Sequence, residues 1–577
     1  MNRCCMIISV LILTSSVLFA QTGQLGGRIT DSETGRPLPG VAVSVSKTGK
    51  GAYTDHSGVY MIRDLPAGTC RIEISMISYK TENRTVTIQG GETTHLDIIL
   101  RPKAIDVKGV VVTPGHYGIS RGSDDSDQFL TVDEIKTTTG AWGDVYMSLS
   151  SLPGVTSHGP AAPIYVQGGR SEENLVLFDK GWVANPFHMD IGGGGVYSIF
   201  TPPLLSGVNL YTAGFGAEYG DCLSAVLDVD TRDGDYYDYK GSASLSMSNA
   251  ELFIEGPIPG TNNRSAFMLS GRRSYFDILI GLSEYDEDFE VFPNYYDFTA
   301  KVSTRISVKH RIALTGLLAA DNAVLKPTAL DSTGGIIGNT EWYSKKGVVS
   351  AGWYASPSEY LNSQMVLSAS LSDIEHLLGG VWHNDETKVV FALREDVTWS
   401  RPENHRVKTG LLADWRIHEV SANMPVLSHR LEHLRIDMPS VEMDTSLAEP
   451  FLGIYVADIW QVTKKVSLAP GMRTDYFFAT DEITFSPRIA AAFEAGEKVV
   501  LRGAWGLYYQ TPPLLELTEG HGNPELSSRR AQHIVGGIET ELIPGFTVRL
   551  EGFYKSFDRL PLKDSTGSLT NEGEGYA

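Results

Sequence analysis

The most extensive pattern in the sequence is a two-residue alternation of apolar and polar side chains that starts near Tyr236 and continues through the rest of the chain. In residues 298–306, for example, Phe, Ala, Val, Thr and Ile alternate with Thr, Lys, Ser and Arg. Residues 239–248, 499–507 and 546–552 repeat the pattern. Successive side chains of a β-strand point to opposite faces of its sheet. The alternation therefore predicts a mainly β fold with a long antiparallel sheet in this part.

Alternation by itself fits two kinds of sheet. A soluble sandwich turns its apolar face inward, whereas a transmembrane barrel turns that face to lipid and its polar face to the lumen. The polar positions here are largely Ser, Thr, Lys, Arg and Glu, and such a face is too charged for a dry core. Aromatic pairs also gather at predicted strand ends, where amphipathic rings would meet lipid headgroups. These pairs are Tyr236–Tyr237, Tyr295–Tyr296, Trp342–Tyr343, Trp353–Tyr354 and Tyr508–Tyr509.

The connections between the predicted strands alternate in length, which separates the two possibilities further. Short turns are predicted near 308–309, 463–465 and 495–498, and long loops at 277–296, 320–341, 417–449 and 511–529. Bacterial outer-membrane barrels combine short periplasmic turns with long extracellular loops. Residues 236–577 are therefore predicted to form an antiparallel transmembrane β-barrel, with about 14 strands at roughly 24 residues per strand and connection.

Composition supports export and excludes several classes of protein. The chain has 577 residues, of which 42% are hydrophobic, and its mean hydropathy of −0.10 is too polar for a bundle of membrane helices. The one long apolar run, residues 6–19, is too short to span a bilayer, so residues 1–20 are predicted to be a signal peptide. A net charge of −21 argues against a nucleic-acid partner.

The four cysteines give neither a disulfide framework nor a zinc motif. Cys4 and Cys5 lie in the predicted signal peptide, and Cys70 and Cys222 fall in different predicted domains. A bridge between Cys70 and Cys222 and two separate buried thiols both stay open, the second being favoured. No spacing of Cys and His suggests zinc, and His188 with Asp190 is a lone polar pair on a loop. We predict no metal and no cofactor.

Residues 21–102 are predicted to form a small β-sandwich. Short strands over 24–31, 40–46, 52–55, 58–62 and 70–76 are separated by Gly, Pro and Asp turns. The motifs TG-x-PL-x-GV, TD-x-x-G-x-Y and L-x-x-G occur in this order, and they resemble the carboxypeptidase-regulatory-like domain, a β-sandwich of transthyretin type. No nucleophile, zinc motif or paired carboxylates accompany them, so no enzymatic activity is predicted.

A compact mixed α/β unit, residues 117–235, lies between this sandwich and the alternating strands. Residues 141–152 have helical spacing, and two short strands flank a tight turn of glycines. Four motifs follow one another in this unit. They are Leu152-Pro153-Gly154-Val155, Val166-Gln167-Gly168-Gly169-Arg170, Val176–Asp179, and Phe215–Gly220 with Tyr219.

This order of motifs resembles the plug domain of TonB-dependent outer-membrane receptors of the Bacteroidetes type. Gln167 stands where the family has Arg, and Lys180 where it has Gly. The resemblance identifies as plug-motif residues Leu152, Pro153, Gly154, Val155, Gly168, Gly169, Arg170, Asp179, Tyr219 and Gly220. Such receptors have barrels of about 22 strands, and open sheet edges are costly in lipid. The barrel, with about 14 of 22 strands, is therefore expected to be truncated, either as a fragment or as an incomplete gene model.

A linker, residues 103–116, precedes this unit and contains Val110-Val111-Val112-Thr113. Consecutive valines favour an extended chain. They fit an ordinary edge strand or, by the resemblance, the TonB box, a segment that a partner sheet captures by strand addition. The resemblance favours the TonB box and implies TonB, with its inner-membrane energising complex, as a partner.

The resemblance implies TonB-dependent active import of a ligand across the outer membrane, with lipid around the barrel and the N-terminal domain and the underside of the plug in the periplasm. A surface binding protein or adhesin without transport is the alternative. Residues on a predicted plug loop are candidates for ligand contact, namely Trp182, Asn185, Phe187 and His188. A small molecule, a glycan and a peptide all stay open as ligands, and a surface lipoprotein is a further candidate partner.

Overall fold

The computed structural model divides into two compact units, Met1–Asp106 and Val107–Ala577. It describes residues 22–577 except 32–36, 47, 49, 56, 77–78, 80, 101–126, 158–162, 191–194, 247, 276, 279–288, 308, 327–338, 359, 379–381, 401–403, 426–439, 497, 520–521, 544–545 and 565–567. The predicted signal peptide and the segment Val110–Thr113 lie outside the described residues.

The first unit is a two-sheet sandwich. Its strands are β1 (Thr22–Asp31), β2 (Ala42–Val45), β3 (Lys50–Tyr53), β4 (Val59–Pro66), β5 (Gly68–Ser75), β6 (Glu82–Ile88), β7 (Thr93–His95) and β8 (Ile98–Leu100). One sheet has the order β4-β1-β7 with β8 also on β1, and the other has the order β3-β2-β5-β6. Leu25 and Ile29 of the first sheet share one buried core with Val43 and Ile72 of the second. This confirms the predicted β-sandwich.

The second unit begins with a small domain, residues 127–231, which we call the inserted domain. Its elements are β9 (Asp127–Leu130), α1 (Val132–Thr137), α2 (Val145–Leu149), β10 (Val155–Ser157), β11 (Ile164–Val166), η1 (Ser171–Glu173), β12 (Leu175–Phe178), β13 (Gly181–Trp182), β14 (Phe187–His188), β15 (Tyr197–Ser198), η2 (Pro202–Leu204), β16 (Leu205–Tyr211) and β17 (Val226–Thr231). Its main sheet is mixed, with the order β13-β12-β17-β16-β9, and β10-β11 and β14-β15 form two further pairs.

Local sequence signals set the two helices of the inserted domain. Thr131 and Glu134 form a reciprocal capping box at the start of α1. The Asp144 side chain caps α2 by accepting from the amides of Tyr146 and Met147. Both helices bury apolar side chains, such as Ile135 and Leu149, in the core shared with the sheet. The helix predicted over 141–152 therefore exists, but it covers only Val145–Leu149.

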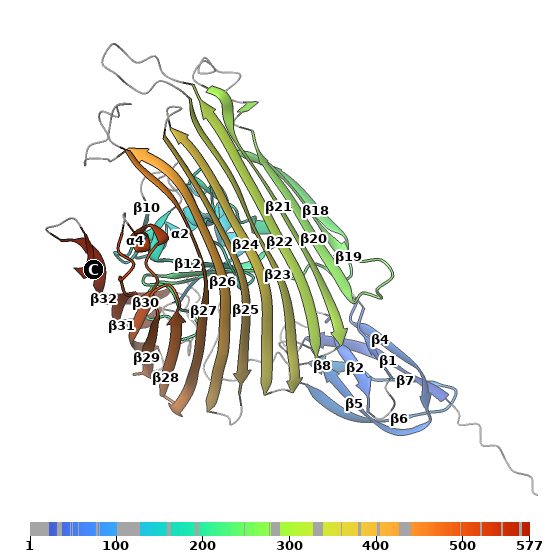
Figure 1. Cartoon of the computed structure of the whole chain (residues 1–577). Coiled ribbons are helices and arrows are strands. Elements are labelled where there is room, and N and C mark those ends of the chain that lie inside the picture. The colour runs from blue at the N-terminus through green and yellow to red at the C-terminus, as the bar shows by residue number, and fades with distance from the viewer. Residues whose placement is uncertain are drawn as a thin grey trace, which may run out of the picture. The chain divides into compact units, whose positions relative to one another are not determined.

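The rest of the second unit is one antiparallel sheet of sixteen strands, β18–β33, which we call the wall. Its elements are β18 (Lys240–Leu245), β19 (Asn249–Pro257), β20 (Ser265–Ser274), β21 (Phe289–Ser307), β22 (His310–Leu325), β23 (Thr340–Ser358), β24 (Leu361–Leu378), β25 (Trp382–Trp399), β26 (His405–Pro425), β27 (Ser440–Thr463), β28 (Val466–Phe477), β29 (Glu482–Glu494), β30 (Val499–Gln510), α4 (Leu514–Leu517), β31 (Arg529–Ile543), β32 (Phe546–Lys563) and β33 (Leu569–Tyr576). Each strand pairs with its neighbour in sequence, and the wall curves around the inserted domain (Figure 1).

The sequence-based count of about 14 strands is low by two, because several connections are tighter than the spacing assumed. The predicted long loops are also shorter than expected. The connections between β20 and β21, β22 and β23, and β26 and β27 span 275–288, 326–339 and 426–439, since the strands extend into residues assigned to loops. The predicted alternation of short and long connections is nevertheless present. The two-residue connections from β21 to β22 and from β27 to β28 lie at the opposite strand ends from these longer ones.

The two faces of the wall have the polarity of a membrane barrel. On β21, Phe298, Val302 and Ile306 are 48%, 39% and 54% exposed, whereas the intervening Thr299, Lys301 and Ser303 are at most 2% exposed. Other strands repeat this arrangement, with Leu314, Leu318, Val349, Leu367, Leu371, Phe391, Trp415, Ile454 and Phe485 on the exposed face. An apolar surface of this extent is not stable in water. The predicted outward orientation of the apolar side chains is therefore confirmed.

Two smaller observations complete the fold. Cys70 and Cys222 are both free thiols; Cys222 is buried, as the favoured alternative expects, whereas Cys70 is only partly buried. Within the part of the chain that the structure describes, no helix is both long enough and apolar enough to cross a bilayer.

The polarity of the wall predicts a position-dependent effect of an introduced charge. Leu367 lies on the outward face of β24. The substitution Leu367→Arg should lower the free energy of unfolding by about 2–4 kcal/mol, because the guanidinium would lie in hydrocarbon. Ser356→Arg, an exposed position beside the short turn after β23, should cost about 1 kcal/mol or less. Guanidinium unfolding in phospholipid vesicles, followed by tryptophan fluorescence, measures both. Equal costs would contradict the assigned orientation.

Candidate functional site: the interface between the inserted domain and the wall

The polar face of the wall contacts the inserted domain, and this interface holds most of the buried charge of the second unit. The inward positions of the wall strands are Lys, Arg, Asp, Ser and Thr side chains with little exposure. A buried charge is tolerated only when it is paired or hydrogen-bonded. The partners of these side chains come largely from the inserted domain, so the interface is where the two parts of the unit are coupled.

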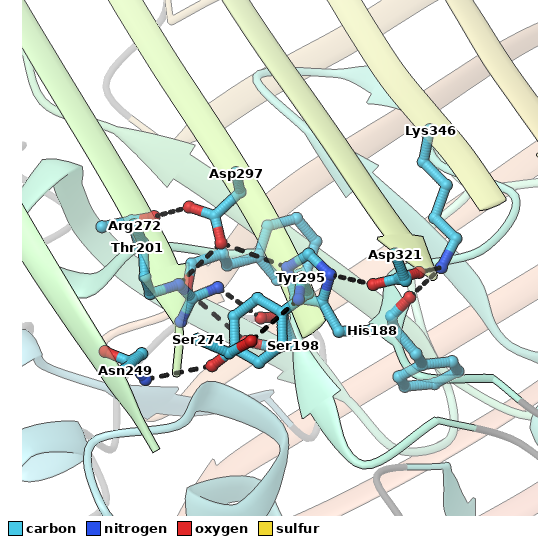
Figure 2. Close-up of polar contacts among 12 residues, drawn as sticks. His188, Ser198, Thr201, Asn249, Arg272, Ser274, Tyr295, Asp297, Asp321 and Lys346 are labelled. Carbon is cyan, nitrogen blue, oxygen red and sulfur yellow. Dashed lines mark hydrogen bonds and ion pairs between the residues drawn. The ribbon is translucent and has the colours of Figure 1, made fainter. Parts of the chain in front are cut away.

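The first cluster centres on His188 of β14, which is fully buried (Figure 2). Its Nδ1 lies 2.5 Å from Asp321 Oδ1, and its Nε2 lies 3.1 Å from Asp297 Oδ2. The ring also stacks on Tyr295, with 4.2 Å between centroids. Both ring nitrogens therefore lie within hydrogen-bonding distance of carboxylates from two different wall strands.

Cations of the wall complete this cluster. Asp297 accepts from Arg272 Nε at 2.6 Å, and Asp321 accepts from Lys346 Nζ at 3.0 Å. Both cations also reach the inserted domain. Arg272 Nη2 donates to the carbonyl of Ser198 at 2.6 Å, and Lys346 Nζ donates to the carbonyl of Phe187. The cluster therefore binds the β14-β15 pair to four adjacent wall strands, β20–β23 (Figure 2).

The second cluster is built around the predicted motif residue Asp179. Its carboxylate accepts from the amide and the hydroxyl of Thr231, at 2.8 and 2.6 Å, within the inserted domain. It also accepts from Lys301 Nζ at 3.2 Å and from Thr315 Oγ1 at 2.6 Å, both on the wall. Burial raises the pKa of Asp179, but Lys301 and the hydroxyl donors outweigh it, and the net shift is downward. Asp179 therefore stays ionised and joins the two parts.

The contacts of Lys180 explain why this position departs from the family pattern, which has Gly here. Its φ of +66° lies in the left-handed region, which Gly adopts at little cost and other residues do not. Its ammonium forms ion pairs with Asp228 and, at 3.3 Å, with Asp230, both on β17. Burial opposes the charge, yet these carboxylates raise the pKa of Lys180. The ion pairs offset the backbone strain that Gly would avoid.

The third cluster includes the FGAEYG motif. Glu218 forms an ion pair with Lys408 at 3.0 Å, and Asp221 forms one with Arg416. Burial alone would raise the pKa of Glu218, but Lys408 and neighbouring donors lower it to about 2. The Tyr219 hydroxyl donates to Asp228 at 2.9 Å. A Cβ at Gly220 would overlap Nε of Arg473, so Gly leaves the space that this buried guanidinium occupies.

Two further wall cations bind backbone carbonyls of the inserted domain. Lys555 of β32, which is fully buried, donates to the carbonyls of Val166 at 3.2 Å and of Thr212 and Ser224 at 3.0 Å each. Arg488 of β29 donates to the carbonyls of Phe215 and Gly216. These contacts depend on where the backbone lies and carry no sequence signal on the inserted domain.

The remaining motif residues shape the inserted domain itself. Leu152 and Val155 are in its core, and the Pro153 carbonyl accepts from Gln128 Nε2 at 3.1 Å. The Gly154 carbonyl accepts from the amide of Gln167 at 2.7 Å, which closes the LPGV turn onto the VQGGR turn. Gly168 and Gly169 form the latter turn, and the Arg170 side chain is exposed beside Glu172 at 3.4 Å. Gln167 donates to Glu551 of the wall at 3.2 Å.

The four candidate ligand residues are not all available at a surface. Trp182 on β13 is partly buried against an apolar cluster, and Asn185 donates to Asp190 at 2.8 Å. The Phe187 ring packs edge-on against Tyr146 at 4.7 Å. His188 is fully buried in the first cluster, and ligand contact by this residue stays a prediction. The local sequence gives no sign of this cluster, because both carboxylates that contact His188 come from the wall.

Sequence reasoning did not single out five cations that carry the interface, namely Arg272, Lys301, Lys346, Arg488 and Lys555. The sequence feature that could have identified them is the alternation pattern, because each cation occupies a polar position of an alternating strand and therefore faces inward. Among the described residues, no group of three or more His, Cys, Asp or Glu side chains is arranged so that it could hold a metal ion.

Comparisons with known proteins agree with this arrangement. The CarboxypepD_reg-like domain family matches residues 25–112, and the TonB dependent receptor-like, beta-barrel family matches residues 224–576. The wall is thus the part of the second unit that matches the outer-membrane β-barrel family, and the inserted domain lies against its polar face. Because the barrel family covers more than half of the sequence, the chain belongs to the TonB-dependent receptor family, and it is an outer-membrane protein. Members of this family are receptors and transporters rather than enzymes.

Individual relatives share parts of the sequence. The TonB-dependent receptor P3 of Formosa agariphila is 26% identical over 163 residues, and the TonB-dependent transporter Oar of Myxococcus xanthus is 22% identical over 244 residues. The matches cover 28% and 40% of this chain, and 15% and 22% of those relatives' lengths.

Solved structures share the fold. The siderophore receptor PirA of Pseudomonas aeruginosa has a TM-score of 0.57 at 14% identity, over 79% of this chain and 80% of its own. The ferric enterobactin receptor PfeA of the same species, in a mutant form, has a TM-score of 0.59 at 13% identity, over 78% and 76%.

The His188 cluster gives a matched pair of substitutions. His188→Phe keeps a ring against Tyr295 but leaves Asp297 and Asp321 short of a buried donor, and should cost about 3–5 kcal/mol. His405 also stacks, on Trp460 at 5.5 Å, and bonds a carboxylate, Asp458, at 2.6 Å, but it is partly exposed. His405→Phe should therefore cost about 1 kcal/mol or less.

Hydrogen exchange of residues 181–200 and unfolding in vesicles would measure this difference. Exchange in 181–200 should accelerate in His188→Phe and stay as in the unsubstituted protein in His405→Phe. Equal protection in both variants would mean that the first cluster does not anchor the β14-β15 pair.

Proposed function

We propose that this protein imports a ligand across the outer membrane in a TonB-dependent manner. The observation that carries the proposal is that the inserted domain occupies the polar face of the wall through ion pairs and hydrogen bonds, such as those of His188, Asp179 and Glu218. A domain in this position obstructs passage along the wall. Import therefore requires that the domain be moved.

The chemistry of the interface suits a domain that is held firmly and can still be displaced. Buried ion pairs contribute little net stability, because the loss of hydration offsets most of the attraction between the charges. Water can also replace a polar partner when two polar surfaces separate, whereas separated apolar surfaces gain no such compensation. A polar interface thus fixes the position of the domain without making its displacement as costly as opening an apolar core.

The proposed attachment point for TonB is Val110–Thr113, in the stretch of sequence that precedes the inserted domain. The first described strand after the linker is β9, at the edge of the main sheet of that domain, and among the described strands it pairs with β16 alone. Tension applied through the linker would reach this edge strand first. Four residue pairs, from Leu130↔Val208 to Asp127↔Tyr211, connect it to the rest of the sheet.

The ligand is proposed only as a class: a small molecule, a glycan or a peptide. Two structural neighbours are named as siderophore and ferric enterobactin receptors, and these names apply to those proteins. Trp182, Asn185 and Phe187 remain proposed ligand contacts because each lies on the β13-β14 segment of the inserted domain. A surface lipoprotein is a further proposed partner.

Proline substitutions in the linker test the proposal. Val111→Pro or Val112→Pro removes a backbone donor that strand addition needs, so binding of the soluble periplasmic domain of TonB from the same organism should weaken at least about tenfold. Ser123→Pro, which lies between the linker and β9 and outside the valine segment, serves as the control and should bind normally. Isothermal titration calorimetry on the detergent-solubilised full chain measures all three. Unchanged binding in the valine variants would overturn the proposal in favour of a surface binding protein or adhesin without transport.

A further inference from the structure

The outward face of the wall carries a hollow across strands β21–β25. Its cavity has a volume of about 680 Å³ and is lined on the outward face by apolar side chains. Those side chains are Phe298, Leu318, Ala320, Val349, Ala369, Leu371, Val389 and Phe391. The volume falls in the range of small-molecule sites rather than of gaps between single side chains. The hollow faces the hydrocarbon of the membrane, because the apolar residues that line it belong to the lipid-facing surface.

The register of the sheet explains the hollow. One row of directly paired outward residues runs Phe298, Leu318, Gly347, Leu371, Val389 across the five strands. Gly347 provides no side chain in the middle of this row, and an added Cβ would lie 2.8 Å from Leu318 Cδ2. The adjacent row contains Gly316 and Ala369 on either side of Val349. The base of the hollow is therefore formed by small residues such as Gly347 and Ala369, and larger side chains such as Leu318 and Leu371 form its sides.

The next row toward the loop 326–339 is polar. It runs Arg273, Tyr296, Ala320, Lys345, Asp373, Thr387, again as direct pairs. The row lies two residues from Gly347, or about 7 Å along the strand. The apolar band therefore ends here, and Lys345, which also lines the cavity, stands at the boundary.

The charged side chains of this row differ in how fully they are paired within the protein. Arg273 is bound to Asp277 and lies over the ring of Tyr296 at 5.5 Å. Asp373 accepts from Thr387 Oγ1 at 2.8 Å. The Lys345 side chain is 70% exposed, and its ammonium is 3.9 Å from Asp373, at the limit of an ion pair. An exposed cation thus lies beside the apolar hollow, at the edge of the apolar band.

We propose that this hollow is a specific lipid site, in which an acyl chain of a phosphate-bearing membrane lipid lies over Gly347 and the lipid phosphate is bound by Lys345. The outer-membrane location of the protein places lipid against this face, and the charge of Lys345 complements a phosphate. A lysine within the apolar band would be costly, whereas one at its edge attracts an anionic headgroup. The inference concerns the outer surface of the wall and is independent of import.

Native mass spectrometry of the detergent-solubilised full chain tests the proposal with two lipids that share their acyl chains. Dioleoylphosphatidylglycerol carries the phosphate, and dioleoylglycerol lacks it. The unsubstituted protein should retain one phosphatidylglycerol molecule at least tenfold more tightly than dioleoylglycerol. Lys345→Gln should remove most of this preference, and Gly347→Phe, which fills the hollow, should weaken retention of both lipids.

The control is Leu314→Phe, an outward position on β22 that does not line the cavity, and it should retain lipid as the unsubstituted protein does. Should Gly347→Phe fail to fold, Lys345→Gln alone still decides between specific and general lipid contact. Equal retention of the two lipids by the unsubstituted protein, or a phosphatidylglycerol preference unchanged in Lys345→Gln, would overturn the proposal.

Discussion

A sheet with a charged inner face and an apolar outer face is stable only when both faces meet a matching environment, and this requirement governs the second unit. The outer face needs lipid, because its Phe, Leu, Ile, Val and Trp side chains are exposed over strand after strand. The inner face needs partners for buried Lys, Arg and Asp side chains. The inserted domain supplies those partners through side chains such as His188 and through backbone carbonyls.

The inserted domain is in turn shaped to reach the wall. Asp179 and Lys180 both have positive φ, which directs consecutive side chains to different partners. Asp179 binds Lys301 of the wall, and Lys180 binds Asp228 of its own sheet. Strained backbone of this kind persists when the surrounding contacts determine it. The strain at this turn is therefore connected to the attachment of the domain.

Local patterns predicted much of the fold, and they failed where long-range contacts decide. Alternation identified the wall, because the two faces of a strand follow a period of two, and the charge of the polar positions with the lengths of the connections gave the orientation of its faces. It gave too few strands because several connections are tighter than assumed, and it gave overlong loops because polar residues at the strand ends, such as those at 417–425 and 440–449, have the composition of loops while continuing the ladder. The buried cluster at His188 was not predicted, since its partners Asp297 and Asp321 lie more than a hundred residues away in sequence.

The sequence by itself determined the sandwich, the alternating sheet and the order of the plug motifs, since each of these depends on spacing within a few residues. Only the tertiary structure decided which inward cations meet which part of the inserted domain. Lys555 and Arg488 bind backbone carbonyls, and because every residue offers the same carbonyl group, only the path of the chain selects the acceptors. The hollow at Gly347 likewise depends on register, because a single Gly forms a groove only when Leu318 and Leu371 are aligned beside it.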